Sequence, residues 1–173
     1  MKRFFLVVSL FLYSFAYADI LDFQTLKADF EQTIVNEQNS TILYKGTLYI
    51  KKPDKILWQY DSPIKKSIFI NKYNVTVYEP ELYQAVIFKQ QKELNPIKMF
   101  QESKKISPTE RISEFDGNRI HIQLDNEKVR SMSFRDKVDN DVTIRFITFL
   151  KNGKLEDRLF VFEPGEDVDI IRQ

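Results

Sequence analysis

The chain contains no cysteine among its 173 residues. It therefore has no disulfide framework, no thiolate metal site and no cysteine to which a lipid could be attached. It also contains a single histidine, His121, whereas a zinc or iron site needs several nitrogen, sulfur or carboxylate ligands. We expect neither a metal nor any other cofactor.

Glycine is also scarce. The four glycines of the chain, Gly46, Gly117, Gly153 and Gly165, are too far apart to form a phosphate-binding loop. Nucleotide-binding folds that depend on glycine turns are therefore disfavoured. Acidic and basic residues are interspersed and nearly balance, with a formal net charge of +1, so we expect no nucleic-acid partner.

The sequence offers little for catalysis. His121 lies in an alternating stretch, on the side that we expect to face solvent. No Gly-x-Ser-x-Gly segment is present to carry a nucleophilic serine. Two acidic pairs occur, Glu79 with Glu81 and Asp139 with Asp141, and both coincide with expected turns, where such residues serve the backbone. We expect that the protein is not an enzyme.

One long apolar run is present, at the start of the chain. It covers residues 4–15, follows two basic residues and precedes Ala16 and Ala18, which is the pattern of a cleaved export signal. The run is shorter than the ~20 residues that a membrane-spanning helix needs. We therefore expect removal of residues 1–18, and a single domain of residues 19–173 that is not embedded in a membrane.

From Thr41 onward, apolar and polar residues alternate with a period of two, which is typical of half-buried strands. Turn signals such as Asp116-Gly117 and Asn152-Gly153 join neighbouring strands as hairpins, and Leu159 to Phe162 is expected to add a short strand. The pattern predicts a mostly β (α+β) fold of roughly ten antiparallel strands. Such a sheet should curl around whatever covers its apolar face.

Two segments favour short helices. Phe23, Leu26 and Phe30 have helical spacing, although the residues after Ala28 alternate as a strand, so a helix is expected up to about Lys27 and a strand beyond it. Asn95-Pro96 can cap and begin a second helix that ends near Ser103. Two or three short helices are expected in total.

Five segments, in this order along the chain, resemble those of a known family. They are Phe30-Glu31-Gln32 as a Phe-x-Gln segment, residues 46–60 as a basic-Pro turn followed by a strand with Trp58, residues 78–84 as a tyrosine-turn-glutamine hairpin, Asn95-Pro96 as a helix start, and residues 160–171 as a closing Phe-x-Phe and Asp-Val-Ile segment. The chain thereby resembles the periplasmic outer-membrane lipoprotein carriers (LolA-type).

The resemblance implies an open, incomplete antiparallel β-barrel of about ten or eleven strands, with short helices forming a lid over its hydrophobic concave face. It implies a periplasmic chaperone that binds the acyl chains of lipoproteins released from the inner membrane and carries them to the outer membrane. The expected partners are triacylated lipoproteins, an inner-membrane lipoprotein-releasing ABC transporter and, as in many bacteria, an outer-membrane lipoprotein receptor. We expect the carrier itself to be a monomer.

The residues expected to line the lipid-binding cavity follow from the alternation of each strand. They are Ile56, Trp58, Ile68, Ile70, Val86, Phe88, Ile120, Ile122, Ile144 and Phe146. A register error of one residue would move the whole set of a strand to the other face. Ordinary core packing explains the stripe of Ile56, Trp58 and Tyr60 equally well from periodicity alone.

The resemblance also points to a lid latch or partner contact at Lys52 and Ile56. Lys52 stands in the basic-Pro turn, where the family usually has Arg, and Ile56 stands where it often has Phe. A lysine offers a mobile point charge and not a planar fork, so a Lys52 latch should be weaker or differently built. Two other functions stay open: a periplasmic lipid-binding or sensing module on the same half-barrel, and a periplasmic hydrolase.

Overall fold

The computed structural model describes residues 22–89, 96–115, 117–126 and 128–173. Within these residues the strands are β1 Thr25–Val35, β2 Thr41–Lys51, β3 Lys55–Ser62, β4 Lys66–Ile70, β5 Asn74–Glu79, β6 Gln84–Lys89, β7 Lys104–Ser107, β8 Glu110–Phe115, β9 Asn118–Asp125, β10 Lys128–Arg135, β11 Asp141–Phe146, β12 Leu150–Lys151 and β13 Asp169–Arg172. One α-helix, α1 Pro96–Gln101, and two 3₁₀ helices, Pro80–Leu82 and Asp157–Phe160, complete the described elements.

The described strands form one open sheet. Their order is β13-β6-β5-β4-β3-β2-β1-β11-β10-β9-β8-β7, with β12 beside β1 and with no pairing between the end strands β13 and β7. The mostly β, incomplete barrel is therefore confirmed, with thirteen described strands where ten or eleven were expected. The short strand β7 was missed because its four residues show no alternation of apolar and polar side chains.

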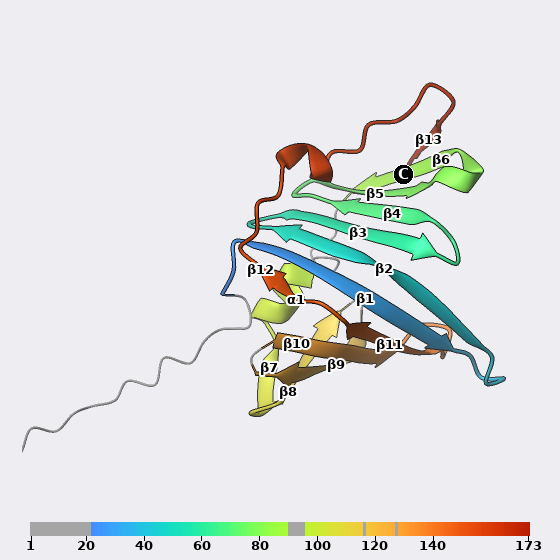
Figure 1. Cartoon of the computed structure of the whole chain (residues 1–173). Helices are drawn as coiled ribbons and strands as arrows, with labels where there is room; N and C mark the ends of the chain where they lie inside the picture. Colours follow the sequence, from blue (N-terminus) through green and yellow to red (C-terminus); the bar gives the residue numbers. More distant parts are fainter. Residues whose placement is uncertain (1–21, 90–95, 116, 127) are drawn as a thin grey trace, which may run out of the picture.

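The sheet turns around its longest central strands. β1 pairs along its whole length with β2, but only its second half pairs with β11, in the register Phe30 with Phe146. Register shifts occur next to Gly46 in β2 and between Val129 and Ser131 in β10, and such bulges increase the bend of a strand. Figure 1 shows the two parts of the sheet on either side of β1 turned toward each other, with α1 between them.

The helix α1 lies on the inner face and is fixed to β8. Met99 and Phe100 are buried, and side chains of the neighbouring strand satisfy carbonyl groups at the helix end, which have no partner inside a helix. Ser113 Oγ donates to the Met99 carbonyl at 2.7 Å, and Arg111 Nε and Nη2 donate to Ser103 Oγ and to its carbonyl, both at 2.7 Å. The helix expected from Asn95-Pro96 is confirmed from residue 96; Asn95 lies outside the described residues.

The helix expected before Lys27 is wrong for the described residues. Thr25 to Lys27 belong to β1, and Leu26 pairs with Ile50 of β2. Backbone pairing with β2, the next strand, and with β12, which is far away in the sequence, determines the structure of this segment, and the helical spacing of its apolar residues does not. Within the described residues, α1 is therefore the one α-helix of the expected lid, and Phe23 covers the core from an irregular segment.

The C-terminal segment crosses the outer face of the sheet. The strand expected at Leu159 to Phe162 is wrong, because residues 157–160 form a 3₁₀ helix and the chain then runs extended without a partner strand. The Phe162 ring packs on Phe69 and Tyr78, with centroids 5.7 and 5.2 Å apart. Figure 1 shows this segment leaving β12 and ending at β13, which pairs in parallel with β6 and so departs from the antiparallel pattern.

The turn expected at Asn152-Gly153 exists, but it does not form a hairpin. Asn152 has a left-handed backbone with φ of 60°, and its Oδ1 accepts the backbone N–H of Gln24 at 2.7 Å. The turn therefore fastens the N-terminal segment instead of pairing two consecutive strands. The expected export signal, residues 1–18, lies outside the described residues. Among the residues that are described, no helix has the length and apolar character needed to cross a membrane.

Candidate functional site

The inner face of the sheet contains an apolar cavity of about 320 Å³. Strands from both sides of β1 contribute to its wall, and α1 contributes Met99. The wall consists of Gln32, Trp58, Tyr60, Ile68, Ile70, Val75, Val77, Phe88, Met99, Ile120, Met132, Phe134 and Ile144. None of these residues carries a charge, so the cavity suits a hydrocarbon ligand.

The register of the strands explains how one part of this wall forms. β3, β4, β5 and β6 pair consecutively as antiparallel neighbours, and residues that are partners across a pair lie on the same face. Two such rows reach the cavity: Trp58, Ile68 and Val77 in one, and Ile70, Val75 and Phe88 in the other. The alternation of these strands thus places apolar side chains at the cavity wall.

Ten residues were expected to line a cavity, and six of them line this one. They are Trp58, Ile68, Ile70, Phe88, Ile120 and Ile144. Ile56 and Ile122 are fully buried in the surrounding core, with 0 % exposed surface, and do not reach the wall. Val86 is paired with Val77 on the inner side but lies outside the wall. Phe146 lines a smaller apolar space next to Phe149.

Seven wall residues were not among the ten expected ones. They are Gln32, Tyr60, Val75, Val77, Met99, Met132 and Phe134. Val75, Val77, Met132 and Phe134 lie in expected strands and follow their alternation, so the same signal could have identified them. Met99 would have followed from placing the expected helix over the cavity. Gln32 gave no such signal, because a polar residue is not expected on an apolar face.

An aromatic cluster depends on the absence of a side chain at Gly46. The Phe30 ring lies 5.1 Å from the ring of Trp58 and 5.2 Å from that of Tyr60, and Gly46 is the paired residue between Phe30 and Tyr60. A Cβ atom at Gly46 would lie 2.8 Å from Phe30 Cζ and 2.0 Å from the carbonyl oxygen of Gln59. Only glycine therefore allows these rings to meet across β2.

Three polar groups belong to the otherwise apolar wall. Tyr60 Oη donates a hydrogen bond to Gln32 Oε1 at 2.8 Å. Burial raises the pKa of the Tyr60 phenol well above its usual range, with a smaller contribution from Tyr44, so the hydroxyl stays protonated. Trp58 Nε1 is fully covered and has no hydrogen-bond partner within the described part of the chain.

Lys52 lies beside the first described residues of the chain. Its Nζ atom is 4.9 Å from the centroid of the Phe23 ring, and its backbone N–H donates to the Gln24 carbonyl at 2.9 Å. Phe23, which Lys52 contacts, and Phe100, which belongs to α1, both line the smaller apolar space. This space therefore connects the surroundings of Lys52 with the helix. A latch at Lys52 stays a prediction. Ile56 is fully buried and could meet a partner only after the structure opens.

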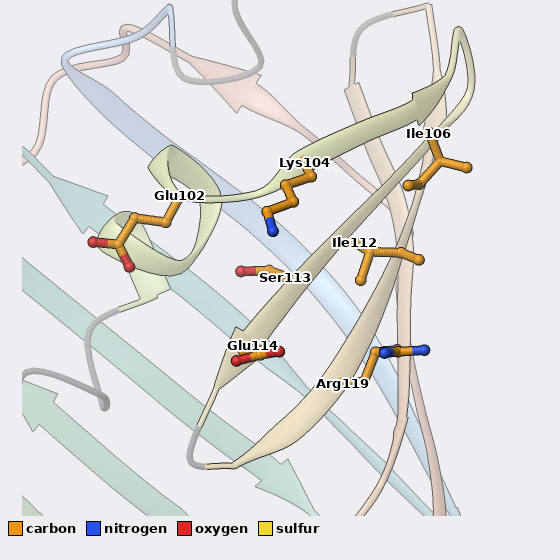
Figure 2. Close-up of a pocket in the computed structure, with 7 residues that line it drawn as sticks. All are labelled: Glu102, Lys104, Ile106, Ile112, Ser113, Glu114 and Arg119. Carbon is orange, nitrogen blue, oxygen red and sulfur yellow. The ribbon is translucent and has the colours of Figure 1, made fainter.

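Two further hollows are larger but carry charges. One of about 450 Å³ lies beside the end of α1, where Figure 2 shows Glu102 and Lys104 at one side and Glu114 and Arg119 at the other. Another, of about 650 Å³, lies between the outer face and the C-terminal segment, and Lys154 and other charged residues line it. Burying such charges against hydrocarbon is costly, so the inner cavity is the better candidate for an apolar ligand.

His121 does not form a catalytic group with a nucleophile. Its Nδ1 atom lies 3.3 Å from Glu110 Oε1, and its side chain is exposed on β9. In the part of the chain that the structure describes, no group of three or more His, Cys, Asp or Glu residues could hold a metal ion.

Comparison with known proteins agrees with this geometry. The family model "Outer membrane lipoprotein carrier protein LolA" matches residues 22–163. A protein of Campylobacter jejuni named outer-membrane lipoprotein carrier protein is 33% identical over 172 residues, which cover 99% of this chain and 100% of the relative. A protein of the same name from Helicobacter pylori strain J99 is 33% identical over 151 residues, covering 87% and 81% of the two chains.

A solved structure supports the fold alone. The crystal structure of an uncharacterized conserved protein from Thermus thermophilus superposes with a TM-score of 0.56 at 11% sequence identity, and covers 87% of this chain and 91% of that chain. The two proteins thus have a similar fold despite their low sequence identity.

Proposed function

Because the chain belongs to the LolA family of outer-membrane lipoprotein carrier proteins, we propose that it is a periplasmic chaperone for lipoproteins. It binds the acyl chains of triacylated lipoproteins released from the inner membrane and carries them to the outer membrane. The observation that carries the proposal is the uncharged cavity between the sheet and α1. A carrier of this kind needs no catalytic group, since it breaks no covalent bond.

The free energy of lipid burial limits how much of the lipid a reversible carrier can bury. A triacylated lipoprotein contributes on the order of forty methylene groups, and burying them all at ~0.8 kcal/mol each would release more than about 30 kcal/mol. Reversible complexes do not exceed roughly 20 kcal/mol. The carrier must therefore bury only part of the lipid, or spend part of the gain on opening its own closed form.

We propose that loading opens the structure, and that α1 is the element that moves. It has six residues and is held to β8 by a hydrogen bond from Ser113 and by the burial of Met99 and Phe100. Displacing the helix would enlarge the cavity, because Met99 is part of its wall. The free energy spent on displacement lowers the net affinity, and delivery then becomes possible.

Export and partners are part of the same proposal. Removal of residues 1–18 would release a single domain, residues 19–173, into the periplasm as a monomer. An inner-membrane lipoprotein-releasing ABC transporter would load it, and an outer-membrane receptor would unload it. The energy for loading would come from the transporter, since the sequence of the carrier has no phosphate-binding loop.

The decisive experiment is release of a lipoprotein from spheroplasts. Purified protein lacking residues 1–18 should bring a newly made lipoprotein into a soluble complex. Ile68→Glu places a charge at the cavity wall and should abolish release, whereas Thr143→Glu, on the exposed side of β11, should not. The proposal is wrong if a known carrier releases the lipoprotein in parallel and this protein does not.

The identity of a copurified ligand separates the carrier from a lipid-binding or sensing module. Native mass spectrometry of protein purified from the periplasm should detect triacylated protein if the chain is a carrier. Free fatty acid or phospholipid in its place would favour the sensing module.

A further inference from the structure

The cavity wall contains one polar position whose hydrogen-bonding capacity is only partly used. Gln32, Tyr60 and Trp58 are its polar members, and the ten other wall residues are aliphatic, phenylalanine or methionine side chains. A polar group on an apolar wall costs free energy unless it is hydrogen-bonded. An apolar residue at position 32 would pack against hydrocarbon at no such cost. The presence of glutamine therefore suggests that the bound ligand has a polar group at this position.

The strand register brings these three groups together. Trp58 and Tyr60 are two residues apart on β3 and therefore point to the same face. Gly46, between Tyr60 and the β1 strand, has no side chain, so the Tyr60 ring reaches across β2 and its hydroxyl meets Gln32 Oε1 at 2.8 Å. This bond fixes the orientation of the amide, because a hydroxyl proton is donated to its oxygen.

The fixed amide presents donors. With Oε1 engaged by Tyr60, the Nε2 hydrogens of Gln32 are available, and within the described residues the structure records no acceptor for them. Trp58 Nε1 is a second donor without a partner at good hydrogen-bond geometry, in a side chain that is 9 % exposed. Gln32 Nε2 and Trp58 Nε1 therefore offer hydrogen atoms to an acceptor, whereas the Tyr60 hydroxyl proton is already donated to Gln32.

Building on the proposed function, we propose that Gln32, oriented by Tyr60 and supported by Trp58, donates a hydrogen bond to an uncharged carbonyl oxygen of the bound lipid. The acceptor is the ester or amide carbonyl at the root of an acyl chain. The absence of charged residues from the wall disfavours a carboxylate or phosphate, which would be buried without a counter-ion. A carbonyl needs only one or two donors, which these side chains supply.

The test compares two lipids that differ only in this carbonyl. The probes are a short diacylated lipopeptide with two ester-linked chains and its dialkyl ether analogue, titrated by calorimetry into protein lacking residues 1–18. The wild type should bind the ester about three- to tenfold more tightly than the ether, as one net hydrogen bond predicts. Gln32→Met, which keeps the length of the side chain, should abolish this preference and leave binding of the ether unchanged.

Two further variants separate hydrogen bonding from packing. Tyr60→Phe removes the hydroxyl that orients the amide and should reduce the ester preference without changing the ether affinity. Tyr49→Phe makes the same change at a tyrosine that pairs with Leu57, away from the cavity, and should behave as wild type. Far-UV circular dichroism shows whether each variant is folded. If Gln32→Met is not folded, Tyr60→Phe alone tests the hydrogen bond to the carbonyl.

The outcomes distinguish this inference from the function on which it rests. Equal wild-type affinities for ester and ether, or an equal loss of both in Gln32→Met, would overturn the carbonyl site and leave the carrier function standing. Failure of the wild type to bind either probe would overturn both.

Discussion

Gly46→Ala tests the packing on which the cavity depends. Gly46 lies in β2 between Phe30 and Tyr60, and an added Cβ atom would lie 2.0 Å from the Gln59 carbonyl oxygen and 2.8 Å from Phe30 Cζ. The first neighbour is backbone of the adjacent strand, so it cannot turn away as a side-chain end could. β2 and β3 must separate at this point, or the Phe30 ring must leave its place.

The cost can be estimated from what is lost. Overpacking a core typically costs about 1–3 kcal/mol. Moving β2 from β3 weakens at least one backbone hydrogen bond, worth ~1 kcal/mol, and moving Phe30 weakens aromatic contacts with Trp58 and Tyr60 worth ~0.5–1.5 kcal/mol each. We expect Gly46→Ala to lower the free energy of unfolding by about 3 kcal/mol or more. For a domain of this size, Tm should fall by roughly 6–12 °C.

The assay is urea denaturation followed by the fluorescence of Trp58, the only tryptophan of the chain. Gly153→Ala is the matched control, because a Cβ atom there meets nothing within 4 Å, and the free energy should change by less than about 0.5 kcal/mol. Gly117→Ala should cost ~1 kcal/mol from its positive φ of 78° alone. If Gly46→Ala proves as stable as Gly153→Ala, the account of the aromatic cluster is wrong.

Three further predictions concern the C-terminal segment, the helix and the latch. Lys51 and Lys55 lower the pKa of Asp157 from 3.8 to about 2, so its ion pairs hold the C-terminal segment above about pH 4 and are lost as the pH falls toward 2. Amide exchange in this segment should become faster over that pH range, and Asp157→Asn should give the faster exchange already at neutral pH. Ser113→Ala leaves a carbonyl of α1 without its donor and should weaken the helix by about 1–2 kcal/mol, seen as faster amide exchange in α1 alone. Lys52→Leu removes the cation over the Phe23 ring and should give a protein that binds lipoprotein but transfers it poorly to outer-membrane vesicles; unchanged transfer would place the latch elsewhere.

The meander from β2 to β6 was predictable because its signals are local. Each strand alternates, and each is joined to the next by a turn with its own chemistry. Asn71 Oδ1, for example, accepts the backbone N–H groups of Tyr73 and Asn74 and so closes the turn between β4 and β5. Family resemblance supplied what local signals do not contain, namely that the sheet remains open and is covered by a helix.

Two segments near the ends of the chain were not predictable from local pattern. Alternation predicts the strand after Ala28, but Thr25 to Lys27 extend β1 because Leu26 pairs with Ile50 of β2 and with Lys151 of β12, which is more than a hundred positions away. Leu159 and Phe160 were expected in a strand, yet they belong to a 3₁₀ helix whose first residue, Asp157, forms ion pairs with Lys51 and Lys55. Long-range contacts decided both segments, and a single sequence does not show them.

Alternation gives the face of a residue but not its depth. Ile56 and Trp58 share a face of β3, yet Ile56 is fully buried in core and Trp58 reaches the cavity wall. What separates them is position along the strand relative to α1 and to the opposite part of the sheet. The same holds for the missed cavity residues on β5 and β10. Alternation predicts that they face the interior, but it does not predict that they lie at an unfilled part of it.

The free energy needed to displace α1 determines which lipids the carrier can bind. Burial of Met99 and Phe100 contributes roughly 1.5–3 kcal/mol each, so displacing α1 costs about 3–6 kcal/mol, which about four to eight buried methylene groups would offset. For a single acyl chain of roughly fifteen methylenes, at most ~9 kcal/mol of the burial free energy then remains, before the entropy lost on binding is subtracted. A second and a third chain contribute further burial free energy without the cost of displacing the helix again. We therefore expect a triacylated lipopeptide to bind at least a hundredfold more tightly than a free fatty acid of the same chain length. Met99→Ala should lower the cost of opening, which both ligands share, and so should tighten the binding of both by the same factor, and calorimetry with both ligands measures it. A Met99→Ala variant that bound neither ligand more tightly than the wild type would show that α1 does not have to be displaced, and the reasoning to an opening step would fail.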